Sequence, residues 1–142
     1  MSFLKLLVLG FVAGFLATLV FHQSAWYLLV HAGIIPADRP AWPLDAIPPL
    51  GIPSVVSKAF WGGLWGAVLA LFFSRIQGAA YWLTWIIVGA LVPTLVAIYV
   101  VPLVKGLDIG TLWPRIAIGG TVNGAWGLGT AIFLKLFGAT RT

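Results

Sequence analysis

The stretch that decides the fold is Lys58-Ala-Phe-Trp-Gly-Gly-Leu-Trp-Gly-Ala-Val-Leu-Ala-Leu-Phe-Phe-Ser-Arg75, which is apolar throughout and carries a cation at each end. Within it, Gly62, Gly66 and Ala70 recur every four residues, so they share one face of a helix. A helix without a polar face is either deeply buried or embedded in lipid. In lipid, small residues four apart let a second helix backbone approach closely. The stretch therefore predicts a transmembrane helix that packs tightly against another helix.

The overall composition extends this prediction to the whole chain. The 142 residues are 61% hydrophobic and 8% charged, and the mean hydropathy is +1.08. A soluble domain carries about 25% charged residues, so a chain of this composition could not cover a soluble surface. The absence of cysteine excludes disulfides and thiol chemistry. The net charge of +5 comes from single cations at the ends of apolar runs, so we expect the lipid bilayer as a partner and no nucleic acid.

Four apolar runs predict an all-α integral membrane protein, a four-transmembrane-helix bundle that forms a single domain over residues 1–142. The expected helices cover residues 3–31, 54–74, 79–104 and 112–137. The sequence that begins the second expected helix resembles the one that begins the fourth, so that Lys58 and Gly62 align with Arg115 and Gly119. This similarity suggests, without establishing it, that the chain consists of two parallel helical-hairpin repeats.

Small residues at four-residue spacing predict which positions pack helix against helix. We expect the Gly62 face to meet the fourth helix. The expected packing positions are Gly10, Gly14, Gly62, Gly66, Gly120 and Gly124.

Residues 33–53 hold six of the nine prolines and break the pattern between the first two helices. Proline at this density blocks helix formation. The segment is nevertheless too apolar for a free linker, so we expect an ordered cap at the membrane surface. Ser54, directly after Pro53, is the expected side-chain cap of the second helix.

The charges orient the chain only weakly, because the cations divide evenly between the two sides. One side would carry Lys5, Arg75, Lys135 and Arg141, and the other Arg39, Lys58, Lys105 and Arg115. All three aspartates fall on the side of the proline-rich loop. This clustering favours cytoplasmic termini in a multi-pass protein of the bacterial inner membrane.

Polar side chains inside the predicted spans are candidate sites, because a polar group in the bilayer marks function by default. His22 and Gln23 form such a pair in the first helix. We expect His22 to bond across helices to Asn123, with Gln23 or a water as the fallback partner.

Lys58 and Arg115 each lie about one turn inside their helices. They are expected to pair with Asp45 and Asp108 and so to pin the loops. The alternative is that an anionic headgroup or solute sits between the two cations.

No carboxylate lies in a predicted membrane core, and no nucleophile–base pair, phosphate loop or metal-protease motif occurs. We therefore expect no enzyme activity, no cofactor and no metal site. The spacing of Gly14, Thr18, His22 and Trp26 resembles the histidine environment of antenna polypeptides, which implies room for a tetrapyrrole as an alternative.

Two short motifs, Phe21-His22-Gln23 and Ala59-Phe60-Trp61-Gly62-Gly63-Leu64-Trp65-Gly66, together resemble a family of short, uncharacterised bacterial inner-membrane proteins with four helices. The resemblance covers most of the chain and implies a layout without a known activity. We expect a non-enzymatic interaction, scaffold or accessory subunit that works through glycine-rich packing, as a homo-oligomer or with a partner membrane subunit. The alternative is a small homo-oligomeric channel or permease for an uncharged or anionic solute, lined by His22, Gln23, Asn123, Lys58 and Arg115.

Overall fold

The computed structural model describes residues 1–140, in which four helical spans are long and apolar enough to cross a membrane. They are Phe3–His31, Ser54–Phe73, Gly78–Val104 and Arg115–Leu136. This arrangement confirms the all-α, four-helix prediction and makes the chain a multi-pass membrane protein. The expected placement of Arg141 lies outside the described residues.

Two of the spans change helix type along their length. The first consists of α1 (Phe3–Ala17), the π-helical segment η1 (Thr18–His22) and α2 (Gln23–His31). The third consists of α4 (Gly78–Leu95), the π-helical segment η2 (Val96–Val100) and α5 (Val101–Val104). Single π-helical turns inside α-helices are frequent at functional sites.

The second and fourth spans are the uninterrupted helices α3 (Ser54–Phe73) and α6 (Arg115–Leu136). The fourth begins three residues later than expected, directly after Pro114. Proline restricts the residue before it to extended backbone, so the helix begins beyond it rather than at residue 112.

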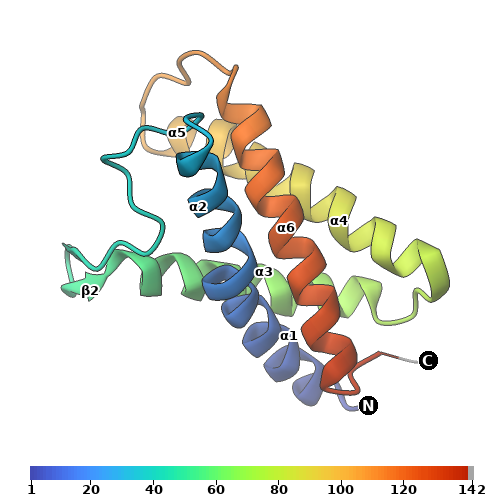
Figure 1. Cartoon of the computed structure of the whole chain (residues 1–142). Coiled ribbons are helices and arrows are strands. Elements are labelled where there is room, and N and C mark those ends of the chain that lie inside the picture. Colours follow the sequence, from blue (N-terminus) through green and yellow to red (C-terminus); the bar gives the residue numbers. More distant parts are fainter. Residues whose placement is uncertain (141–142) are drawn as a thin grey trace.

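The spans pair as two hairpins. The first hairpin joins α1–η1–α2 to α3, and the second joins α4–η2–α5 to α6; these are the pairs with the most extensive contacts. The α1 and α6 helices also contact each other, whereas α3 and α4 touch only sparsely. Figure 1 shows the start of α1 and the end of α6 together at one end of the bundle, which we call the terminal end. Loops 32–53 and 105–114 lie at the opposite end, which we call the loop end.

Glycine contacts hold the first hairpin together. The Gly66 backbone lies so close to α1 that an added Cβ would stand 2.9 Å from the Gly14 Cα, and Gly10 and Gly62 are in equally close contact across the same pair. The close approach expected at Gly62 and Gly66 is therefore confirmed, but the partner helix was predicted wrongly. The partner is α1, because Gly10 and Gly14 carry the same four-residue spacing on the helix that the hairpin places alongside α3.

The second hairpin uses a different glycine pair. A Cβ at Gly89 of α4 would stand 3.0 Å from the Cα of Gly127 in α6. A Cβ added at Gly120 would stand 3.9 Å from the Ala90 carbonyl oxygen of α4, and one at Gly124 would stand 3.5 Å from the Ala90 Cβ, both ordinary van der Waals distances. Both glycines therefore pack against the third span, not against α3 as the sequence had indicated.

The proline-rich segment is an ordered cap, as expected. Its Ile35 and Ala41 side chains are 3% and 6% exposed, and the short strands β1 (Ala46–Ile47) and β2 (Ile52–Pro53) pair antiparallel within it. The indole of Trp42 donates to the Leu19 carbonyl at 2.8 Å, which ties the cap to the first span.

The cap also closes the first turn of α3. Ser54 makes no side-chain cap; instead its backbone N–H donates to the Asp45 carbonyl, and the Val55 N–H donates to the Pro43 carbonyl, both at 2.9 Å. The exposed amides at a helix start need acceptors. Here the folded loop supplies them, so the expected serine cap is wrong.

Candidate ligand-binding cavity

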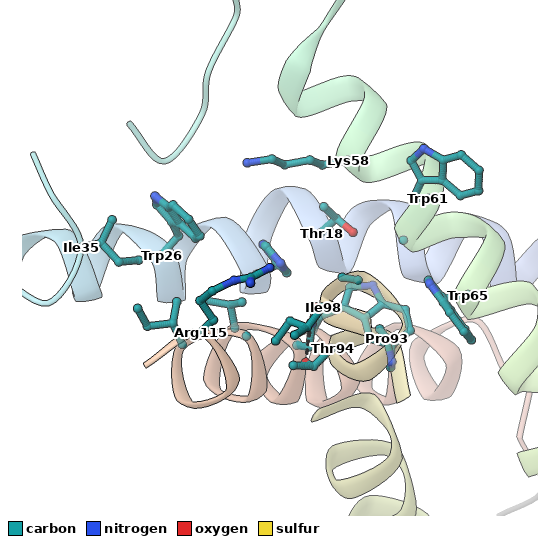
Figure 2. Close-up of a pocket in the computed structure, with 18 of the residues that line it drawn as sticks. Thr18, Trp26, Ile35, Lys58, Trp61, Trp65, Pro93, Thr94, Ile98 and Arg115 are labelled. Atoms are coloured by element: carbon teal, nitrogen blue, oxygen red, sulfur yellow. Dashed lines mark hydrogen bonds between the residues drawn. The ribbon is translucent and has the colours of Figure 1, made fainter. Parts of the chain in front are cut away.

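A cavity of about 540 Å³ lies where all four spans meet near the loop end. Figure 2 shows its walls, with Lys58 reaching over it from α3 and Arg115 from α6 on the opposite side. The volume falls within the range of about 300–1,000 Å³ that is usual for ligand pockets.

The charge of the lining is entirely positive. Arg39 of the cap, Lys58 and Arg115 line the cavity, and none of its lining residues is an aspartate. Lys58 lies half-buried with its Nζ 5.2 Å from the centroid of the Trp26 ring, a cation–π contact. An anion in the cavity would meet three cations, and no carboxylate lines the same space.

The predicted loop ion pairs are not formed. Among residues 1–140 no acid and base approach within 4.0 Å, which includes Lys58 with Asp45 and Arg115 with Asp108. The Arg115 guanidinium donates to the Ile109 carbonyl at 2.5 Å, and Asp108 accepts from the Gly110 N–H at 3.3 Å. Backbone groups nearby satisfy Arg115 and Asp108, and neither Lys58 nor Arg115 forms a salt bridge with a carboxylate of residues 1–140.

His22 and Gln23 bond to each other rather than across helices. The His22 Nδ1 lies 2.6 Å from the Gln23 Oε1, and the Gln23 amide donates to the Ala41 carbonyl of the cap. The preferred partner Asn123 was wrong and the fallback Gln23 was right. Of these two residues only His22 lines the cavity, because Gln23 is fully buried and bonds to the cap.

Asn123 has a different partner, Thr94. Its Nδ2 donates to the Thr94 Oγ1 at 2.8 Å, across the second hairpin. Both residues line the cavity. Thr94 was missed by the sequence analysis, although a hydroxyl beside Pro93 in the middle of an apolar run was the signal that could have found it.

The two π-helical segments occupy matching places on the cavity wall. Thr18 begins η1 and contacts Gly62 of α3, while Thr94 lies just before η2 and contacts Gly119 of α6. The repeat offset in the sequence had already aligned Gly62 with Gly119 and Lys58 with Arg115, and each pair lines the cavity. The contacts thus agree with the repeat that the sequence left open.

The floor of the cavity is closed toward the terminal end. The Trp126 indole lies on the cavity wall and donates to the Gly14 carbonyl at 3.0 Å. Below it the buried side chains of Tyr81, Trp85 and Leu134 fill the bundle. The cavity is therefore accessible from the loop end, where Arg39 and Arg115 are exposed.

The sequence did not predict four further aromatic or cationic residues on the cavity wall. These are Trp26, Arg39, Trp61 and Trp65. Among the described residues no group of three His, Asp or Glu side chains could hold a metal ion.

The fold and this cavity together define a class: a four-span helical membrane protein with a cationic cavity at one end. No protein-family model, curated protein or solved structure matches the chain.

Proposed function

We propose that this protein is a non-enzymatic membrane protein that binds an anionic solute in its central cavity, in the manner of a small permease. The observation that carries the proposal is the lining: Arg39, Lys58 and Arg115 face one space that no carboxylate of residues 1–140 lines. Arg39 and Arg115 are exposed, but Lys58 is half-buried, and burying a cation without a partner is costly. A bound anionic group would offset that cost.

The scaffold role expected from the sequence stays a prediction, which the packing glycines of the first hairpin do not favour. Gly10, Gly14, Gly62 and Gly66 contact one another inside the first hairpin, so they offer no free face to a second subunit. Homo-oligomerisation stays a prediction, to be measured by native mass spectrometry in mild detergent.

A permease would need a second state in which the floor opens. The structure fits the state accessible from the loop end, since the residues between Trp126 and the terminal end are packed. Movement of one hairpin against the other would be the simplest route, as in transporters built from parallel repeats.

Anion binding can be tested by thermal unfolding of the purified protein with inorganic phosphate and sulfate at constant ionic strength. Ligand at about 100 times its Kd stabilises the folded state by about 2.7 kcal/mol. We expect the rise in Tm to vanish in the double variant Lys58→Gln/Arg115→Gln. The matched control Lys5→Gln/Arg75→Gln removes two charges from the terminal end and should keep the rise.

We also propose the bacterial inner membrane as the location, with cytoplasmic termini. Ser2→Cys and Asp45→Cys variants in intact spheroplasts, probed with an impermeant thiol reagent, test this orientation. We expect labelling at residue 45 and not at residue 2. The reverse pattern would show the opposite orientation.

A further inference from the structure

A second hollow of about 650 Å³ lies between α3 and the η2–α5 end of the third span. Its lining is apolar apart from Lys105 at the loop end, all of it within residues 1–140. The walls are formed by Leu64 and Val68 of α3 and by Val96, Val100 and Val104 of the third span.

This crevice adjoins the cationic cavity. Trp61, Trp65, Pro93 and Ala97 line both hollows. Figure 2 shows Trp61 and Trp65 together at one end of the cavity. The crevice is also open at its outer side, because α3 and α4 contact each other only sparsely and Trp61 is 60% exposed. In a membrane the crevice faces the acyl chains.

The two hollows are arranged by polarity in the same order as a bilayer. Lys58 lies four residues inside α3, about 6 Å at 1.5 Å per residue, and Arg115 is the first residue of α6. The polar region of a bilayer is about 5–7 Å thick on each side of the hydrocarbon core. The cations therefore lie at headgroup depth, and the crevice runs beside them at acyl-chain depth.

We infer that the anionic group in the cavity is the headgroup of an anionic phospholipid, which reaches Lys58 and Arg115 from the bilayer and leaves an acyl chain in the crevice. This inference rests on the proposed function, since it names the ligand of the same site. A free inorganic anion would use the cations alone. Only a lipid would use both the cations and the adjoining apolar crevice.

The experiment separates the two hollows by substitution. Protein in mild detergent is titrated with phosphatidylglycerol or phosphatidylcholine, and native mass spectrometry measures the bound fraction. Ala97→Phe fills the junction of cavity and crevice, and Val100→Phe narrows the crevice alone. The matched control is Ala79→Phe, an exposed alanine near the start of α4, at the terminal end.

We expect phosphatidylglycerol affinity to fall at least tenfold in Lys58→Gln/Arg115→Gln, in Ala97→Phe and in Val100→Phe. The control variant and phosphatidylcholine binding should be unchanged. Melting temperatures of the variants establish that each is folded, and either crevice variant alone suffices for the test.

Three other outcomes would overturn the inference. If phosphatidylglycerol binding needs the cations but tolerates both crevice variants, the headgroup binds the cations and no acyl chain occupies the crevice. If inorganic phosphate binds through the cations and the lipid does not, the ligand is a free anion and the proposed function survives. If neither probe depends on Lys58 and Arg115, the proposed function fails as well.

Discussion

The two hairpins follow one plan but pack differently at one matched position. Each has a long span with a π-helical segment in the half toward the loop end, followed by a loop and an uninterrupted helix. In the first hairpin, Gly66 lies against Gly14 at backbone contact distance. In the second, the position that the repeat aligns with Gly66 is Asn123, which bonds to Thr94 instead. The same register is thus used once for close packing and once for a polar wall.

This difference predicts how easily each of the two hairpins can rearrange. Backbone contacts between helices cannot yield without moving the helices, because packed interiors are close to crystal density. Side chains such as Asn123 can turn. At this register we expect the first hairpin to be rigid and the second to be adaptable, although Gly89 and Gly127 hold the second hairpin by a backbone contact of their own.

The largest expected effect compares one glycine-to-alanine substitution in each hairpin. Gly66→Ala would place a Cβ 2.9 Å from the Gly14 Cα, and such overpacking costs about 1–3 kcal/mol. Gly120→Ala meets only the Ala90 carbonyl at 3.9 Å, so the gain in helix propensity of about 0.5–1 kcal/mol remains. Thermal unfolding in detergent should show opposite signs. Equal losses would remove the distinction between the hairpins.

The next effect concerns the loops, since the first hairpin has a packed cap and the second has an exposed loop. Gln23→Leu leaves the buried Ala41 carbonyl without its donor, and an unsatisfied buried group costs about 1–3 kcal/mol. We expect faster amide hydrogen exchange in residues 36–45, with exchange in residues 105–114 unchanged. Unaltered exchange in the cap would show that Trp26 and Trp42 hold it without Gln23.

A smaller effect measures the polar wall of the second hairpin. A double-mutant cycle with Thr94→Val and Asn123→Ala isolates their bond, and such bonds in membranes average about 0.6 kcal/mol and reach about 1.7. The coupling should be measurable by unfolding in detergent. Thr18 bonds to the Gly14 carbonyl of its own span, so a cycle of Thr18→Val with Asn123→Ala should give no coupling.

The smallest effect is expected for His22→Leu. The His22 bond joins it to the neighbouring Gln23 and not to another helix, so its loss should lower the unfolding free energy by less than about 1 kcal/mol. A leucine at residue 22 should be tolerated in the cavity wall, because the apolar Ile98 already lines the same cavity from η2. A loss larger than the strongest hydrogen bonds between membrane helices, about 1.7 kcal/mol, would mean that His22 helps to hold the two hairpins together.

The sequence by itself determined the class and the spans. The stretch from Lys58 to Arg75 and the three other apolar runs predicted four membrane helices with ends within three residues of those observed. This succeeds because hydropathy over about 20 residues is a local property, and the bilayer imposes one length on every span. The sequence also predicted that Lys58 and Arg115 occupy matching positions, because each cation precedes a glycine, Gly62 or Gly119, at the same spacing.

Only the tertiary structure decided which surfaces meet. Periodicity shows that Gly62 and Gly66 share a face, but every glycine stripe in the chain offers the same spacing, so the choice of Gly14 over Gly120 was invisible. The partners of Gln23, Asn123 and Arg115 also depend on how the loops fold back and how the hairpins lie side by side. The cavity arises from the same cause, since its lining gathers residues from Thr18 to Trp126 that no local pattern connects.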